Sequence, residues 1–189
     1  MAGNFGKGAA WRLGSMVVAA TALAILASGA CRGKDTGAGN AGGAGAGGRI
    51  GGAVTDLRFV DLDGREHTSA SLQGKLVMVD FWDTWCGPCL RALPHLKELG
   101  EAHEGRLVVV AVAIGQEGEA KVREVVARQA LPFPVVMHGA QGDLVPAFGE
   151  VSALPTTFLL DQQGVIRQRW VGAQSPSTYA RAVSDLLGS

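Results

Sequence analysis

Apolar residues in this chain gather into runs that have the spacing either of buried strands or of amphipathic helices. Residues 76–82 and 107–114 are near-continuously apolar, which is typical of strands covered on both faces of a sheet. Residues 119–129 instead place their valines on one side of a helix. Shorter strands are expected at 57–60, 65–68, 133–137, 156–160 and 165–171, and further helices at 88–99, 144–148 and 176–187.

The order of these elements predicts an α/β domain. Strands and helices alternate between residues 76 and 137, which favours parallel pairing through right-handed crossovers. Turn residues at 61–64 and 161–164 each join two strands into an antiparallel hairpin. A loop is expected at 71–74. We therefore expect a central mixed sheet flanked by helices, preceded by an N-terminal β-hairpin extension and closed by a C-terminal helix.

The N-terminus has the order of residues found in a secretory signal. Lys7 and Arg12 precede an apolar stretch at 13–27, which small residues follow. A permanent transmembrane helix is the weaker alternative, because such a helix needs about 20 apolar residues and this stretch is shorter. We expect residues 1–30 to be a signal peptide, and the chain to be exported to the cell envelope or periplasm.

Cys31 stands directly after this stretch. Residues 27–31 resemble a bacterial lipobox, in which the cysteine is lipidated and becomes the first residue after cleavage, although Ser28 stands where that motif usually has leucine. The resemblance implies that Cys31 is a lipidation site and that a lipid anchors the protein to a membrane. The alternative is an ordinary signal peptide, with Cys31 removed or left as a free thiol.

Residues 31–52 differ in composition from the rest of the chain. From residue 33 onward they are mostly glycine and alanine with no hydrophobic period, so they cannot bury enough surface to offset the entropy of ordering. A flexible tether of this length has an end-to-end distance of roughly 25 Å. We expect the folded domain to occupy residues 53–189.

Charge gives no indication of a polyanionic partner. Lysine and arginine together number 17, as do aspartate and glutamate, so no overall field attracts nucleic acid or an acidic membrane surface. We therefore expect no nucleic-acid partner. The sequence gives no information on oligomeric state.

The cysteine pair Cys86 and Cys89 indicates the chemistry. Gly87 and Pro88 separate the two cysteines, and the pair follows a buried strand and opens a helix. The first cysteine then lies where free backbone N–H groups stabilise a thiolate, with the second one turn further along. In this arrangement Cys86 attacks a substrate disulfide, and Cys89 resolves the mixed disulfide that results.

Two other roles for the pair are disfavoured. A zinc site needs further ligands at suitable spacing, yet His67, His95, His103 and His138 are scattered along the chain, and we expect no metal. A purely structural disulfide across so short a loop constrains little of the unfolded chain. Each histidine is interpreted as a surface residue.

Asp80 interrupts the apolar run at 76–82, six residues before Cys86. Burial of a carboxylate in a central strand raises its pKa, so Asp80 can accept the proton of Cys89 during resolution. We expect this proton-transfer role. The alternative is a residue at a strand end that simply meets water.

Two segments resemble thioredoxins. Residues 79–89, VDFWDTWCGPC, match the active-site stretch of that family, and residues 154–161, LPTTFLLD, look like its cis-proline loop and following strand. With its N-terminal hairpin and signs of export, the chain is similar to the TlpA/ResA branch over residues 53–189. The resemblance implies a thioredoxin-like fold and membrane-attached thiol-disulfide oxidoreductase activity.

The resemblance also implies roles for individual residues. It implies a cis peptide between Leu154 and Pro155, with the backbone before the proline binding the substrate. Trp85 and Pro155 shape the groove, and Gly87 and Pro88 tune the thiolate. The redox-active disulfide is the only redox group, so no cofactor is expected.

The chain departs from the TlpA/ResA branch at two positions. Many members carry asparagine where this chain has Asp80, and some carry glutamate where it has Ala92. Asp80 restores the thioredoxin arrangement, which is why the proton-transfer role is given to it.

The direction of electron flow is interpreted as reduction, because Gly87 and Pro88 resemble the dipeptide of reducing members. Expected partners are exported proteins with disulfides, including apocytochromes c, and a membrane thiol protein that donates electrons. The alternatives left open are a disulfide oxidase or isomerase and a non-catalytic tethered module that binds copper or a client through its thiols. Peroxide reduction is disfavoured, because it requires a peroxidatic cysteine with threonine and arginine nearby, and no such cluster precedes Cys86.

Overall fold

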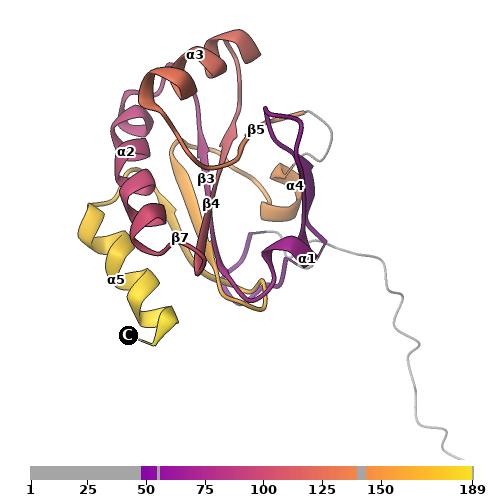
Figure 1. The fold of residues 1–189 in the computed structure, drawn as a ribbon, viewed down its shortest axis with the longest axis vertical. Coiled ribbons are helices and arrows are strands. Elements are labelled where there is room, and N and C mark those ends of the chain that lie inside the picture. Colours follow the sequence, from indigo (N-terminus) through magenta and orange to yellow (C-terminus); the bar gives the residue numbers. More distant parts are fainter. Residues whose placement is uncertain (1–47, 55, 140–143, 189) are drawn as a thin grey trace, which may run out of the picture. The chain divides into compact units, whose positions relative to one another are not determined.

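The computed structural model describes residues 48–54, 56–139 and 144–188. Its elements follow the order strand, strand, helix at the N-terminus and then the alternation expected from the sequence (Figure 1). They are β1 (Arg58–Val60), β2 (Glu66–Thr68), α1 (Ser69–Leu72), β3 (Leu76–Trp82), α2 (Gly87–Ala102), β4 (Leu107–Ala113), α3 (Glu119–Gln129), β5 (Val135–Met137), α4 (Val145–Phe148), β6 (Thr156–Leu160), β7 (Ile166–Val171) and α5 (Pro176–Leu187). Cys31, the expected signal peptide and most of the expected tether lie outside the described residues.

The central sheet has the strand order β5-β4-β3-β6-β7. Strands β3, β4 and β5 are parallel, whereas β6 runs antiparallel to both β3 and β7. The first two strands form a separate antiparallel hairpin. This mixed sheet flanked by helices confirms the expected α/β class and the N-terminal hairpin.

Side chains of β3 alternate between two covered faces. Val77, Val79 and Phe81 lie in a core cluster with residues of the hairpin, α1 and α4. Leu76 and Met78 pack against α2 and α5, and Trp82 packs in a third cluster with residues of α2 and α3. Figure 1 shows α2, α3 and α5 on one side of the sheet and α1 and α4 on the other. All seven residues of β3 are buried, which places Asp80 in the interior.

Helix α1 was not expected, because residues 71–74 were interpreted as a loop. Thr68 caps the helix by accepting a hydrogen bond from the Ser71 backbone N–H, while the Ser71 side chain accepts one from the Thr68 backbone. This reciprocal cap satisfies two donors that would otherwise lack a partner at the helix start. Leu72 is buried at the other end of the helix, and the expected loop shrinks to the residues after it.

Residues 48–52, assigned to the tether from composition, pair with the folded domain. The Gly51 N–H donates to the carbonyl of Ile166 at 2.8 Å, and the Ile166 N–H donates to the carbonyl of Gly52 at 2.9 Å. Gly48 is buried with φ +66°, and a Cβ there would lie 1.8 Å from the Phe148 carbonyl oxygen. Backbone pairing needs no side chains, so a glycine-rich segment can still cover the start of β7.

Candidate active site

Cys86 and Cys89 lie where β3 gives way to α2. Cys86 is the N-cap residue of α2, and its Sγ accepts a hydrogen bond from the Cys89 backbone N–H at 3.3 Å. The two sulfur atoms form a disulfide, and the two Cα atoms are 5.2 Å apart. N–H groups of a first helical turn have no partner within the helix, and the helix dipole is positive at this end. A thiolate on Cys86 is therefore stabilised by its position.

Exposure separates the two cysteines. Cys86 is 4% exposed and Cys89 is 0% exposed. Another molecule therefore reaches the sulfur of Cys86 before that of Cys89. Trp85, directly before the pair, is 54% exposed, which is unusual for so large an apolar side chain. Gly87 is half-buried and Pro88 is exposed. The surface around the disulfide is therefore apolar and open.

Pro155 lies at the same end of the sheet as Cys86. The Leu154–Pro155 peptide bond is cis, as the family resemblance implied. Thr156 pairs with Phe81 in the antiparallel register of β3 and β6, so Pro155 lies level with the end of β3 from which the chain continues to Cys86. Leu154 packs against the core cluster that contains both cysteines. The two motifs, far apart in the sequence, are therefore brought together.

A groove with a volume of about 330 Å³ lies between these two segments. Trp85 and Gln116 line one part of it, and Val151 and Leu154 line another. The groove is thus continuous with the exposed indole beside the disulfide. Its lining mixes these apolar side chains with polar ones such as His138 and Ser152.

Asp80 is a carboxylic acid in a dry environment. Its side chain is 0% exposed, Oδ1 accepts a hydrogen bond from Thr157 Oγ1 at 2.7 Å, and Oδ2 has no hydrogen-bond partner among the described residues. Burial raises the pKa of Asp80 from 3.8 to about 7, against the smaller opposing effect of the Thr157 hydrogen bond. The raised pKa expected from the sequence is confirmed, and it lies where a group can both accept and release a proton at neutral pH.

Asp80 also lies beneath the cysteines. In β4 its register partner is Ala111, and Ala111 belongs to the buried cluster that contains Trp82, Cys86 and Cys89. Side chains of register partners point to the same face of a sheet. Asp80 therefore faces α2, on the side where the disulfide lies.

A second buried carboxylate, Asp83, escaped the sequence interpretation. Its Oδ1 accepts a hydrogen bond from the Thr84 N–H at 2.7 Å, and its Oδ2 accepts one from the Gln116 N–H at 3.2 Å. The Thr84 hydroxyl, which has a single proton, donates it to the carboxylate of Glu117 and lies 3.2 Å from Asp83 Oδ1. Asp83 thus connects the segment before Cys86 to the loop after β4 through hydrogen bonds. The only signal in the sequence is an acidic residue between a buried strand and a tryptophan.

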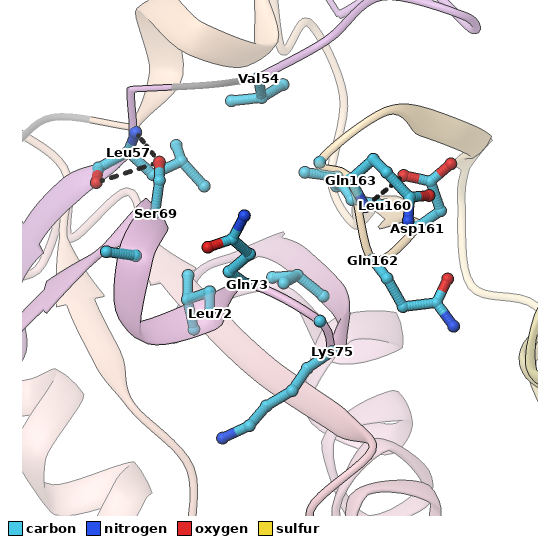
Figure 2. A pocket seen from close by; sticks show the side chains of 14 residues that line it. Val54, Leu57, Ser69, Leu72, Gln73, Lys75, Leu160, Asp161, Gln162 and Gln163 are labelled. Carbon is cyan, nitrogen blue, oxygen red and sulfur yellow. Dashed lines mark hydrogen bonds between the residues drawn. The ribbon is translucent and has the colours of Figure 1, made fainter.

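A larger cavity lies at the opposite end of the sheet. It has a volume of about 660 Å³ and lies between α1 and the turn that joins β6 to β7. Figure 2 shows Gln73 reaching into this space, with Gln162 on the facing turn. Lys75 and Val77, at the start of β3, also line it. Because β3 rises about 3.3 Å per residue, this cavity lies roughly 20 Å from the end of β3 that leads to Cys86. The volume of a cavity alone therefore does not identify where the redox chemistry takes place.

Within the described residues, no group of three or more histidine, cysteine or acidic side chains is placed to hold a metal ion. The histidines have separate surroundings. His67 Nε2 lies 2.8 Å from Asp61 Oδ2, and His95 Nδ1 lies 3.8 Å from Glu98 Oε2. His67 lies in β2 and is not an isolated surface residue, because its ring stacks on Phe59, its register partner in β1.

A thiol-disulfide oxidoreductase of the thioredoxin type is the class of protein that this arrangement defines. The chain belongs to the Redoxin family, which it matches over residues 49–186. It is 36% identical over 127 residues to the thiol-disulfide oxidoreductase ResA of Geobacillus thermodenitrificans, which covers 67% of this chain and 71% of that protein. ResA of Geobacillus kaustophilus is 33% identical over 138 residues, which are 72% of this chain and 78% of that protein.

A solved structure shares the same architecture. The thiol:disulfide interchange protein of Chlorobium tepidum superimposes with a TM-score of 0.64 at 30% identity, covering 74% of this chain and 98% of that one. The family expected from the active-site and cis-proline motifs is confirmed. Among the helices of the described residues, none has the length and apolar character needed to span a membrane.

Proposed function

We propose that the protein is an exported, membrane-tethered reductase of protein disulfides that works through Cys86 and Cys89. The observation that supports it best is the placement of Cys86, which is 4% exposed, at the N-terminus of α2, bonded to a fully buried Cys89. The family and the names of its relatives support thiol-disulfide exchange in general.

In the reduced protein, the Cys86 thiolate attacks one sulfur of a substrate disulfide. A bond forms between Cys86 and that sulfur, and the other substrate sulfur leaves as a thiolate that takes a proton from water. Cys89 then loses its proton and attacks Cys86 Sγ, which releases the second substrate thiolate. Two electrons have passed to the substrate, and the pair ends as the disulfide seen in the structure.

Asp80 accepts the Cys89 proton in this second step. Cys89 has no exposed surface, so water does not reach it readily, and the proton needs an internal acceptor. A carboxylate whose pKa burial raises to about 7 meets that need. When the substrate thiolate leaves, Asp80 releases this proton toward the groove.

Substrate positioning is assigned to residues around the groove. Trp85 offers an apolar surface next to the reacting sulfur, and the backbone at Leu154 pairs with an extended substrate strand in front of Pro155. Gly87 and Pro88 begin α2 and keep the first turn open to the Cys86 sulfur. Extended protein segments that carry a disulfide are therefore the proposed substrates, including the haem-attachment cysteines of apocytochromes c.

Reduction requires a source of electrons. Each turnover leaves the Cys86–Cys89 disulfide, and a dithiol protein of the membrane is proposed to reduce it. A lipid on Cys31 and a tether over most of residues 31–52 would hold the domain close to such a donor and raise its effective concentration. Residues 1–30 are proposed as the signal peptide, and the cell envelope or periplasm as the location.

The reduction potential of the Cys86–Cys89 pair tests the direction of electron flow. Equilibration with glutathione or with a thioredoxin of known potential is expected to give a value near −270 mV, typical of a reductase, as a rough figure. A value above about −150 mV would identify an oxidase instead. Tight copper binding without turnover of a disulfide peptide would identify the binding module.

Membrane attachment has its own test. Cells that express the full chain are fractionated, and the fate of a Cys31→Ser variant is compared with that of the parent. The proposal expects the parent in the membrane fraction and the variant free of it. Equal distribution of the two would contradict lipidation while leaving the redox chemistry untouched.

A further inference from the structure

Two hydroxyl groups connect Asp80 to the C-terminal helix. Thr157 Oγ1 donates to Asp80 Oδ1 at 2.7 Å, and Thr157 Oγ1 lies 3.1 Å from the Tyr179 hydroxyl oxygen. Both side chains are fully or almost fully buried. Thr157 is the register partner of Asp80 across β3 and β6, and Tyr179 comes from α5. The chain of contacts is therefore part of the rigid core.

Counting protons fixes the direction of these hydrogen bonds. A threonine hydroxyl has a single proton, and Thr157 gives it to Asp80. In its contact with Tyr179, Thr157 must then be the acceptor, so the Tyr179 hydroxyl donates. In this series of hydrogen bonds, Tyr179 donates to Thr157 and Thr157 donates to the Asp80 carboxylate.

The state of Tyr179 agrees with this direction. Burial raises the pKa of Tyr179 and the nearby charge of Asp80 raises it further, against hydrogen bonds with Thr157 and the Gln174 backbone that lower it. A phenol with a raised pKa keeps its proton at neutral pH, so the Tyr179 hydroxyl is available as the donor to Thr157.

We propose that Thr157 and Tyr179 are positioning residues for Asp80, forming a one-way chain of donors that keeps Oδ1 an acceptor and leaves Oδ2 to take up the proton. The proposal rests on the proton-transfer role given to Asp80 above, and it identifies which oxygen performs it. The absence of any partner for Oδ2 among the described residues agrees with this division. These hydrogen bonds keep the Asp80 carboxylate ionised down to a lower pH than burial alone would allow.

Few other groups near Asp80 titrate. The elements packed around it are β4, β6, α2 and α5. β4 and β6 place Ala111 and Thr157 beside it, and neither ionises in this pH range. Helix α2 contributes Cys89 and α5 contributes Tyr179. Burial raises the pKa of Asp80 and the Thr157 hydrogen bond lowers it, so hydrogen bonding is the main counterweight to burial.

The test replaces each hydroxyl and measures the pKa of Asp80 directly, from the carboxyl carbon chemical shift in the oxidised protein. Thr157→Val keeps the side-chain shape, and loss of a hydrogen bond to a charged group is expected to raise the Asp80 pKa by about one to two units. Tyr179→Phe is expected to raise it by less, in the same direction. Thr157→Ser, which restores the hydroxyl, is expected to return the pKa to within a few tenths of the parent value.

Thr156→Val is the matched control. Thr156 is the neighbouring residue of β6 and is equally buried, but its hydroxyl donates to the Ala153 carbonyl at 2.7 Å and it points to the opposite face of the sheet. It is expected to leave the Asp80 pKa unchanged. An unchanged pKa in Thr157→Val, or an equal rise in Thr156→Val, would overturn the proposal. If Thr157→Val does not fold, Tyr179→Phe and Thr157→Ser decide by the same criterion.

An infrared difference spectrum between acid and alkaline pH tests the division between the two oxygens. The carbonyl band of the neutral Asp80 carboxyl is identified by its loss in Asp80→Asn. If Oδ1 is the carbonyl oxygen, this band moves to higher frequency in Thr157→Val, because a donor to the carbonyl is gone. A band that does not move would contradict the assignment of Oδ2 as the protonated atom.

Failure of this proposal is distinguishable from failure of the proposed function. The pH profile of disulfide reduction is measured for the parent, Thr157→Val and Asp80→Asn. A profile altered by Asp80→Asn but not by Thr157→Val, with an unchanged Asp80 pKa, overturns only the hydroxyl chain. If the pH profile does not change in Asp80→Asn but the Asp80 pKa rises in Thr157→Val, the hydrogen bonds through Thr157 are supported. The proton-transfer role of Asp80 is then excluded.

Discussion

Replacing Asp80 by asparagine is expected to stabilise the oxidised protein in a pH-dependent way. Burial raises the pKa of Asp80 from 3.8 to about 7, so across this interval the folded protein holds a proton that the unfolded chain has released. The free energy of unfolding of the parent is therefore highest below pH 3.8 and falls as the pH rises to about 7. Above that pH the loss is complete. Asparagine does not titrate and lacks this loss.

The size of the effect follows from the shift in pKa. A rise of about 3 units corresponds to about 4 kcal/mol at 1.36 kcal/mol per unit, as an upper value. Relaxation of the core around the charged carboxylate reduces this figure. The cost of placing an amide beside Thr157 is the same at every pH, so it cancels when the effect of the substitution is compared between two pH values.

Denaturant titrations of the oxidised parent and of Asp80→Asn, near pH 4 and near pH 8, measure this difference. The variant is expected to gain about 2 to 4 kcal/mol on the parent between the two pH values. Asp61→Asn is the control. Burial alone would raise the pKa of Asp61, but hydrogen bonds from His67 and the backbone lower it below 3.8, so the contribution of Asp61 to stability is lost only at pH values below this interval. Its substitution is therefore expected to have nearly the same effect near pH 4 and near pH 8. An Asp80→Asn effect that is equal at both pH values would refute the reasoning.

Three further substitutions test the surroundings of the site by the free energy of unfolding. Asp83→Ala removes the acceptor for the buried Thr84 N–H and is expected to cost about 1 to 3 kcal/mol, whereas Asp83→Asn should cost less. Leu93→Ala opens a cavity beneath the cysteines, where Leu93 is 0% exposed, at an expected cost of about 2 to 5 kcal/mol. Thr68→Ala removes the cap of α1 and should cost about 1 kcal/mol, with Thr68→Ser close to the parent. No loss in any of these variants would contradict the contact it removes.

Elements whose signal lies within one stretch of sequence could be predicted closely. The seven residues of β3 and the eleven of α3 match the expected ranges, because an unbroken apolar run and a helical period each define an element locally. The cysteine pair and Pro155 were identified for a similar reason, since each lies in a short motif. The buried state of Asp80 followed from its place within an apolar strand.

Contacts between distant segments could not be predicted in this way. Asp83 and Gln116 are 33 positions apart, and nothing near either residue indicates the other. Thr157 reaches Asp80 only because β6 pairs antiparallel with β3 in one register, and Tyr179 joins them only when α5 packs on that face. Residues 48–52 were assigned to the tether because composition does not report backbone pairing at a sheet edge.

The central claim is that Cys86 attacks the substrate and Cys89 resolves the mixed disulfide. Reduced Cys89→Ser and Cys86→Ser variants are each mixed with a peptide that carries one disulfide, and the adducts are located by mass spectrometry. The account predicts that Cys89→Ser accumulates a peptide adduct on Cys86 and that Cys86→Ser forms none and does not turn over. An adduct on Cys89, or turnover in Cys86→Ser, would contradict it.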